Sequence, residues 1–289
     1  MKTSLQRIVA DDGIELVGLL YEPDQPASKI LVHVHGMAGN FYENRFLDYL
    51  AHTLTAAGVA FFAFNNRGCE LAKDLRKHEG EKRTLVRIGD AFEKFEDSAL
   101  DIKAAVDFAA SKGFSAVHLS GHSLGGPKVA YYLASTQDKR VRSVVFISPA
   151  DMVGLAKQNA HYERDRSTAE KMITEGKGAE QMPFLVWDEN NLSADTYLSI
   201  TSERSPVAIF NLYDKNDPLA TLGKISVPAL TIMGSKDEAL TVSVEELMSR
   251  TKAALTNSPK AETNIMGDAK HSYAGYEQQL ADAVSGWIA

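Results

Sequence analysis

The chain has 289 residues, 44% of them hydrophobic, and a formal net charge of −7, which suits one large globular domain or a domain with an inserted subdomain. The negative charge, without a face rich in Lys and Arg, argues against a nucleic-acid partner. No apolar run is long enough to span a membrane, and the first residues lack the apolar core of a signal peptide. We therefore expect a cytoplasmic protein with no membrane partner. The single cysteine, Cys69, excludes an internal disulfide.

The first part of the chain has the pattern of short strands alternating with helices. A β-hairpin is predicted over residues 5–21, where apolar and polar residues alternate on either side of an Asp-Gly turn. Nearly continuous apolar runs at 29–35 and 59–64 predict strands that are buried on both faces. Helical spacing of apolar residues over 42–57 predicts the helix that joins these two strands.

The next stretch is less regular. Residues 69–91 are charged and irregular, and we expect a long surface excursion near the strand ends. An amphipathic helix is predicted over 92–112, followed by a strand at 116–119 and a helix that begins at 127. A further strand is predicted at 141–148.

The alternation breaks over residues 151–223, where polar residues, scattered aromatic residues and short helical stretches predominate. Strands and helices alternate again over residues 224–289. Such alternation predicts a mostly parallel sheet covered by helices on both faces. The predicted architecture is an α/β core made of residues 1–150 and 224–289, with a helical lid of residues 151–223 inserted after the sixth strand.

A motif for nucleophilic chemistry lies at Ser120–Gly126, with the sequence Ser-Gly-His-Ser-Leu-Gly-Gly. It falls between a predicted strand and a predicted helix, which is the context of a G-x-S-x-G nucleophile elbow. The turn is sharp, and glycines two residues before and after the serine avoid a collision because they have no Cβ. Ser123 is therefore the predicted nucleophile, exposed at the carboxyl end of its strand.

A serine hydroxyl needs a base to take its proton, and in this fold the chain order is serine, acid, histidine. His161 and His271 are the only histidines after Ser123. His161 falls in a charged helical run and has the pattern of a solvated residue, whereas His271 directly follows the last predicted strand, so His271 is the predicted base. Asp237, at the end of the preceding strand, is the predicted acid that orients the imidazole. The neighbouring Glu238 is interpreted as a surface charge.

Backbone N–H groups are predicted to hold the oxyanion of a tetrahedral intermediate. Leu124, directly after the nucleophile, supplies one of them, and Met37, in the loop after the strand at 29–35, supplies the other. His35 is interpreted as bracing this loop, and His122 as packing under the elbow. Both histidines are also kept as candidates for substrate binding.

Aromatic and methionine side chains of the predicted lid could line an apolar substrate pocket or form the lid's own core. These side chains are Tyr162, Met172, Met182, Phe184, Trp187 and Tyr197. Among them, Tyr162, Phe184 and Trp187 are the candidate substrate-binding residues. No Cys/His/Asp cluster with metal-ligand spacing and no phosphate-cradling loop is visible in the sequence, so neither a metal nor a cofactor is predicted.

With these motifs identified, the chain resembles the α/β-hydrolases over nearly its whole length. The stretches that carry the resemblance are residues 35–40, 65–68, 121–126, 235–237 and His271. The resemblance implies an α/β-hydrolase fold and a serine hydrolase with a Ser-His-Asp triad. Many of these hydrolases have D-x-R-G where this chain has Asn65-Asn66-Arg67-Gly68, which puts an ionic brace at this loop in question. Arg67 itself is interpreted as one half of a structural ion pair.

The segments 33–46 and 64–70 are also similar to a group of bacterial esterases found on mobile resistance elements, which open the lactone ring of macrolide antibiotics. This similarity implies a small-molecule ester or lactone substrate, such as a 16-membered macrolide, and a role in antibiotic resistance. Related hydrolases that act on siderophore esters imply an alternative substrate. The rival interpretations are acyl transfer, amide or thioester hydrolysis at the same elbow, and a non-catalytic binding protein on this fold. The sequence does not predict the oligomeric state.

Overall fold

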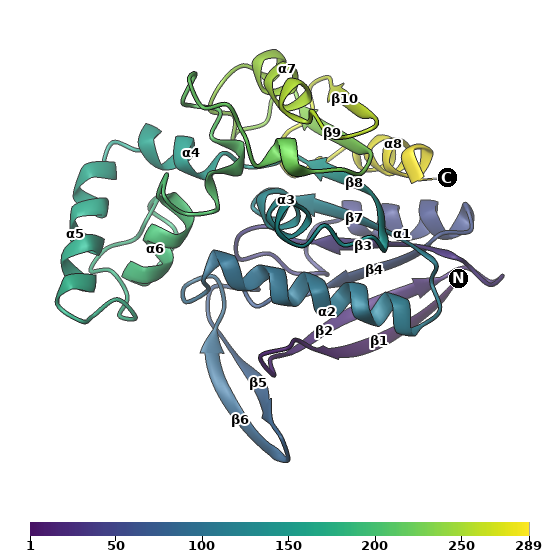
Figure 1. The fold of residues 1–289 in the computed structure, drawn as a ribbon, viewed down its shortest axis with the longest axis horizontal. Helices are drawn as coiled ribbons and strands as arrows, with labels where there is room; N and C mark the ends of the chain where they lie inside the picture. Colours follow the sequence, from purple (N-terminus) through teal and green to yellow (C-terminus); the bar gives the residue numbers. More distant parts are fainter. Residues whose placement is uncertain (289) are drawn as a thin grey trace.

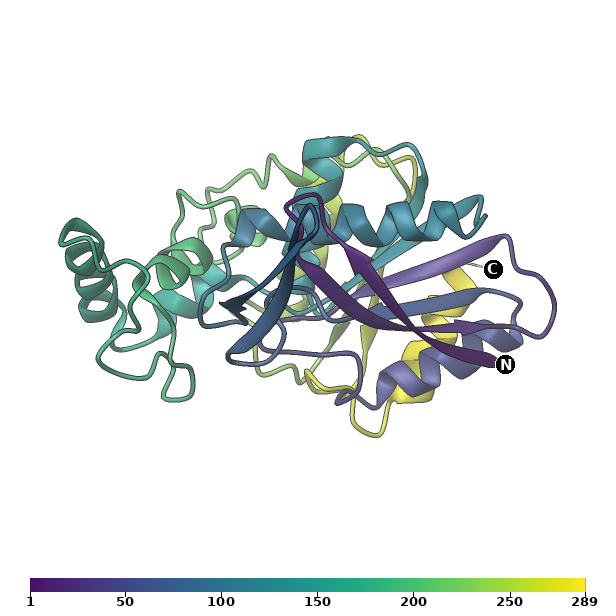
Figure 2. The ribbon, with the colours of Figure 1, turned by 90° about the horizontal axis from the view of Figure 1, so that it is seen from below.

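The computed structural model describes residues 1–288 as a central sheet between two layers of helices (Figures 1 and 2). The strands of this sheet are β1 (Lys2–Val9), β2 (Glu15–Glu22), β3 (Lys29–Val34), β4 (Ala60–Phe64), β7 (Ala116–His122), β8 (Val141–Ile147), β9 (Ala229–Gly234) and β10 (Ala261–Met266). Their order across the sheet is β1-β2-β4-β3-β7-β8-β9-β10. The hairpin β1–β2 and the β2–β4 pair are antiparallel, and all pairs from β4 to β10 are parallel. The sheet is therefore mostly parallel, as predicted.

Helices cover both faces of the sheet. They are α1 (Phe46–Ala56), α2 (Ser98–Ser111), α3 (Gly125–Thr136), α7 (Val244–Ala254) and α8 (Glu277–Ile288). Figure 2 shows α1 and α8 on one face of the sheet and α2 on the other. Strand β4 illustrates why both faces need cover: Phe61 and Ala63 enter the core under α1 and α8, whereas Phe62 and Phe64 enter the core on the opposite face. Among residues 1–288, no helix is both long and apolar enough to cross a bilayer.

A helical segment, residues 152–224, connects β8 to β9, which are the sixth and seventh strands of the main sheet in chain order. Its elements are α4 (Met152–Gln158), α5 (Tyr162–Thr174), α6 (Ala194–Thr201) and the short 3-10 helices η2 (Ala208–Phe210) and η3 (Leu222–Lys224). Side-chain caps start two of them, since Asp151 accepts from the Gly154 N–H at 2.8 Å and Ser193 accepts from the Thr196 N–H at 3.2 Å. Figure 1 shows α4, α5 and α6 at the end of the molecule away from both termini. We call residues 152–224 the inserted segment.

Residues 69–91 form a surface excursion, as expected, but the excursion is regular and not irregular. Most of this stretch forms an antiparallel hairpin, β5 (Lys73–Glu79) and β6 (Lys82–Ile88), which projects from the body of the molecule (Figure 1). Asp74 lies opposite Arg87 in this hairpin, and their side chains form an ion pair at 2.8 Å. One face of the hairpin is exposed, and only Leu75, Val86 and Ile88 on the other face pack against the core, so its sequence shows little of the apolar alternation that predicts a strand.

The helix predicted over 92–112 is shorter than expected, since α2 begins only at Ser98 and a single 3-10 turn, η1 (Phe95–Asp97), precedes it. The segment 91–95 instead runs along α6. The Ala91 carbonyl accepts from the Ser193 N–H at 2.8 Å, and the Phe95 N–H donates to the Ser199 hydroxyl at 2.8 Å. These contacts tie the inserted segment to the core.

Candidate active site

Ser123 lies on a strained turn between β7 and α3. Its φ of 55° is in the left-handed region, which is uncommon for a residue with a side chain. A Cβ added at Gly121 would lie 2.1 Å from the Gly125 carbonyl oxygen, and one added at Gly125 would lie 2.1 Å from the Val34 carbonyl oxygen. The two glycines are therefore required by close backbone approach, and the local geometry is that of the predicted elbow.

The predicted acid and base are in contact. His271 Nδ1 lies 2.9 Å and 3.0 Å from the two carboxylate oxygens of Asp237. Since an ionised carboxylate only accepts hydrogen bonds, Nδ1 carries the proton. In the neutral imidazole, Nε2 is then left as the proton acceptor, which is the tautomer that a general base needs.

The Asp237 carboxylate receives further donors. The Ala239 N–H donates to it at 2.9 Å, and the Ser148 hydroxyl also hydrogen-bonds to it. Burial raises the pKa of Asp237, but the hydrogen bond and charge of His271 and these two donors outweigh burial, so the pKa lies below its usual value. Asp237 is therefore ionised at neutral pH and fit to stabilise an imidazolium.

Ser148 and Tyr273 are supporting residues that the sequence analysis missed. The Ser148 hydroxyl lies 2.8 Å from the Tyr273 hydroxyl, and both residues are buried. Ser148 directly follows β8, the strand beside β9, so its place at a strand end next to the acid's strand was the available signal. Tyr273 lies two residues after His271, but no pattern in the sequence connects it to Ser148.

Glu238 is an exposed charge, as predicted, and it also contacts the loop that carries His271. Its side chain is exposed and pairs with Lys270 at 3.2 Å. It also accepts a hydrogen bond from the His271 backbone N–H at 3.0 Å. Glu238 therefore helps to fix the loop that carries His271.

His122 packs between the elbow and the base. Its Nε2 lies 2.9 Å from the His271 carbonyl oxygen, and the two rings are 4.8 Å apart between centroids. Burial, with the neighbouring His271 adding to it, lowers the pKa of His122 to about 3, so the ring is neutral. Because the side chain is buried and Nε2 is occupied, these contacts fit the packing role, and substrate contact by His122 stays a prediction.

The loop after β3 lies directly against the nucleophile. A Cβ added at Gly36 would be 2.7 Å from Ser123 Cβ and 3.2 Å from Ser123 Oγ. Met37, the predicted oxyanion donor, is the next residue of this loop. Leu124, the other predicted donor, lies at the N-terminus of α3, where N–H groups have no partner within the helix. Both backbone segments therefore border Ser123.

His35 braces the same loop, as predicted. The Asn66 N–H donates to His35 Nε2 at 3.0 Å, so Nδ1 carries the proton and donates to the Gly36 carbonyl at 2.8 Å. Burial, with Lys128 adding to it, lowers the pKa of His35 to about 3 and keeps the ring neutral. Both nitrogens of the buried ring are occupied by these contacts, and a role of His35 in substrate binding stays a prediction.

Arg67 forms the structural ion pair that was predicted. Its guanidinium binds the buried Asp101 of α2 through Nη2 at 2.8 Å and Nε at 3.0 Å, and it also binds Asp12 at 3.0 Å. An ionic brace is thus present at this loop. The carboxylates of this brace come from Asp101 on α2 and Asp12 in the β1–β2 turn, whereas residue 65 is an asparagine.

The described residues offer little for metal-ion or thiol chemistry. Within the described range 1–288, no three His, Cys, Asp or Glu side chains are arranged to hold a metal ion. Cys69 is buried, and burial raises the pKa of its thiol to about 11, so little reactive thiolate forms at neutral pH.

The lid candidates lie within the inserted segment. Tyr162 lines a cavity of about 570 Å³, together with charged side chains such as Lys157, Glu163 and Arg166. Ser123 and His271 are not among its lining residues. Phe184 is covered by the Arg164 guanidinium at 4.1 Å from the ring centroid. Trp187, with a φ of 53°, lies on a tight turn.

Comparisons with known proteins agree with this fold. Among solved structures, the chain is similar to Est1E from Butyrivibrio proteoclasticus with ferulic acid bound (20% identity, 97% of each chain, TM-score 0.67). It is also similar to the Pyrococcus furiosus esterase Pf2001 (16% identity, 99% of this chain and 92% of that one, TM-score 0.61). The alpha/beta hydrolase GrgF from Penicillium sp. sh18 is similar as well (15% identity, 100% of this chain and 98% of that one, TM-score 0.70). A search of curated proteins gave no match.

At such identities the solved structures support the fold. The family assignment comes from the sequence, since the alpha/beta hydrolase fold family matches residues 29–274, which include the elbow, Asp237 and His271. The chain therefore belongs to the alpha/beta hydrolase fold family.

Proposed function

We propose that the protein is a serine-dependent carboxylic ester or lactone hydrolase that works through an acyl-enzyme on Ser123. The observation that carries this proposal is the Asp237–His271 pair, joined at 2.9 Å and packed through His122 against a strained elbow serine. The existence of esterases with the same fold supports it further.

Acylation begins when His271 Nε2 takes the proton of the Ser123 hydroxyl while Oγ attacks the ester carbonyl carbon. The carbonyl oxygen becomes an oxyanion, which the backbone N–H groups of Met37 and Leu124 stabilise. When the intermediate collapses, the bond from the carbonyl carbon to the alkoxide oxygen breaks. The leaving alkoxide takes the proton from His271, and the acyl group stays on Ser123.

Deacylation reverses the roles. His271 removes a proton from water, and the resulting hydroxide attacks the acyl carbon. The Ser123 oxygen leaves and recovers its proton from the imidazolium. Throughout both steps Asp237 holds the Nδ1–H tautomer and stabilises the charged ring.

For the substrate, we propose a bulky ester or lactone, with the 16-membered macrolide lactone as the first candidate. Opening a lactone leaves the alkoxide attached to the acyl chain, so the product is one hydroxy acid that has gained one water. The similarity of residues 33–46 and 64–70 to macrolide esterases supports this choice, as does an inserted segment large enough to act as a lid. A role in antibiotic resistance and a cytoplasmic location remain predictions.

Labelling with a fluorophosphonate tests the hydrolase function. We expect wild type to label at Ser123 and to hydrolyse p-nitrophenyl acetate, and Ser123→Ala to lose both activities. Ser111→Ala, at the exposed end of α2, serves as the control and should keep both. Wild-type protein that neither labels nor turns over would favour the non-catalytic binding protein.

The substrate is tested by mass spectrometry of a panel of candidates, scored for the gain of one water. The panel includes a 16-membered macrolide, a siderophore ester and simple carboxylic esters. Feruloyl esters belong in it because the similar Est1E structure holds ferulic acid. Turnover of simple esters without any macrolide would keep the hydrolase and reject the macrolide.

A further inference from the structure

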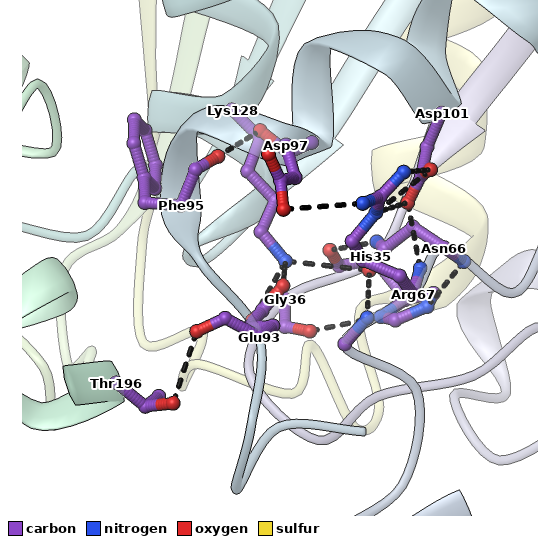
Figure 3. Close-up of polar contacts among 12 residues, drawn as sticks. His35, Gly36, Asn66, Arg67, Glu93, Phe95, Asp97, Asp101, Lys128 and Thr196 are labelled. Atoms are coloured by element: carbon purple, nitrogen blue, oxygen red, sulfur yellow. Dashed lines mark hydrogen bonds and ion pairs between the residues drawn. The ribbon is translucent and has the colours of Figure 1, made fainter. Parts of the chain in front are cut away.

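A fully buried pair of opposite charges lies beneath the candidate active site. Lys128, on α3 five residues after the nucleophile, has its Nζ 2.7 Å and 2.9 Å from the two carboxylate oxygens of Glu93 (Figure 3). Both side chains have 0% exposure. Desolvating two charges is costly, and such pairs often add nothing to stability compared with apolar side chains of similar volume. The pair therefore calls for a role besides stability.

The pair has a third partner, which points toward the reaction centre. Lys128 Nζ also donates to Asn66 Oδ1 at 3.3 Å, and the same oxygen accepts from the Gly68 N–H at 3.0 Å. These two donors fix the orientation of the Asn66 amide, since only its oxygen can accept. The amide nitrogen then faces the His35 carbonyl and donates to it at 3.3 Å.

The contacts continue to the loop beside the nucleophile. The Asn66 N–H donates to His35 Nε2, which sets the His35 tautomer, and His35 Nδ1–H donates to the Gly36 carbonyl at 2.8 Å. Gly36 is the residue whose added Cβ would strike Ser123. A chain of directed hydrogen bonds therefore runs from Lys128 through Asn66 and His35 to the oxyanion loop, residues 36–39.

Glu93 holds Lys128, which is the end of this series of hydrogen bonds farthest from the nucleophile. Its carboxylate lies so close to Gly68 that an added Cβ there would be 2.3 Å from Oε2. Its backbone carbonyl accepts from the Thr196 hydroxyl of α6 at 3.0 Å (Figure 3). Glu93 is thus held by the core and the inserted segment together, and it holds Lys128 in turn.

Burial raises the pKa of Glu93, whereas the charge and the hydrogen bond of Lys128 lower it. Asp90 is also buried, and the backbone of Ala38, in the oxyanion loop, hydrogen-bonds to its carboxyl group. Burial and the nearby Glu93 raise the pKa of Asp90 to about 8, so it is mostly neutral at pH 7. Arg67 and Asp101 neutralise each other beside the cluster. Lys128 is therefore left to Glu93 and Asn66.

We propose that Lys128 and Glu93 are positioning residues for the oxyanion loop. Neither touches the reacting atoms. Lys128 orients the Asn66 side-chain amide, which donates to the His35 carbonyl, and the Asn66 backbone N–H selects the His35 tautomer. His35 in turn holds the Gly36 carbonyl, so that the Met37 N–H faces the oxyanion. This role rests on the proposed function, because it matters only if an oxyanion forms at Ser123.

The test separates positioning from stability by removing both charges. Lys128→Met alone leaves Glu93 unpaired and should destabilise the fold. The double variant Lys128→Met/Glu93→Gln leaves neither charge of this pair without its partner and should recover a melting temperature near that of wild type. It still lacks the donor to Asn66, so kcat for p-nitrophenyl acetate should remain about 10- to 100-fold below wild type, with KM changed less than threefold.

Amide hydrogen exchange supplies a readout that needs no turnover. Residues 36–39 should exchange faster in the double variant than in wild type. Val284→Ala, which truncates a fully buried side chain on α8, is the control for general destabilisation and should leave this loop unchanged.

A double variant with wild-type kcat, or with wild-type exchange over residues 36–39, would overturn the positioning role. Failure of the proposed function would look different, because wild type itself would not be labelled at Ser123 by a fluorophosphonate. The hydrogen-exchange comparison tests whether Lys128 and Glu93 position the loop, whether or not the protein proves to be a hydrolase.

Discussion

The contact between Gly36 and the nucleophile leads to a quantitative prediction for Gly36→Ala. The new Cβ would start 2.7 Å from Ser123 Cβ and 3.0 Å from the His122 carbonyl oxygen. Carbon atoms in ordinary contact are about 3.5 Å apart or more, so the loop or the elbow must move by about 0.8 Å. The elbow is held between β7 and α3, so we expect the loop to yield.

The movement carries the Met37 N–H away from the oxyanion. A misplacement of about 1 Å can lower a rate by about 10²-fold, and loss of one oxyanion donor costs about 10²- to 10³-fold. We therefore expect kcat/KM of Gly36→Ala to fall by about 10²-fold, equivalent to about 2.7 kcal/mol of transition-state stabilisation. Most of the loss should be in kcat, because the donor acts on the transition state.

The assay is hydrolysis of p-nitrophenyl acetate, with folding checked by circular dichroism. Gly286→Ala on α8 is the matched control, since an added Cβ there meets nothing within 4 Å and alanine favours the helix. A folded Gly36→Ala variant with kcat/KM within threefold of wild type would refute the placement of the oxyanion loop against Ser123.

Three further predictions concern acidic residues. Asp237→Asn should lower kcat for p-nitrophenyl acetate by about 10⁴-fold, because the amide no longer selects the Nδ1–H tautomer of His271; a loss below tenfold would contradict its role. Asp101→Ala leaves the buried Arg67 without its main partner and should cost about 3–5 kcal/mol in urea unfolding, whereas a loss below about 1 kcal/mol would contradict the brace. Asp90 has a folded pKa of about 8 against an ordinary value of 3.8. Between about pH 4 and pH 8, the unfolded state has therefore lost this proton while the folded state still holds it. The free energy of unfolding falls as the pH rises through this window, by up to about 1.4 kcal/mol per pH unit. Asp90→Asn should lose less stability than wild type between pH 5 and pH 8, and equal losses would show that Asp90 ionises normally.

The sequence predicted those parts of the fold whose constraints are local. Strands β3 and β4 are buried on both faces, so they require continuous apolar runs that stand out in the sequence. The elbow motif is also local in sequence, because Gly121 and Gly125 lie two residues before and after Ser123, although Gly125 is required by the backbone of Val34 on a neighbouring strand. The order of Ser123, Asp237 and His271 along the chain followed from the same strand pattern, because each residue lies at or near the end of a predicted strand.

The hairpin β5–β6 could not be predicted in the same way. Most of its side chains are charged, and its apolar residues are split between an exposed Leu85 and a short patch of Leu75, Val86 and Ile88 that packs against the core, so the sequence shows no clear alternation. Cross-strand ion pairs such as Asp74–Arg87 become visible only when the register of the two strands is known.

The positioning network was also hidden from sequence reasoning. Glu93 and Lys128 are 35 positions apart, and each looks like a solvent-facing charge in a helical pattern. Ser148 and Tyr273 are 125 positions apart and meet only when the sheet has formed. Contacts of this kind depend on tertiary packing, which local periodicity does not encode.

The central claim is that the elbow serine becomes acylated. The most direct measurement is rapid quenching of the reaction with p-nitrophenyl acetate, followed by peptide mass spectrometry. We predict an acetyl group on Ser123, formed together with a burst of about one p-nitrophenolate per chain. Hydrolysis that proceeds with no acetyl group on Ser123, or with the acetyl group on another residue, would contradict the acyl-enzyme mechanism.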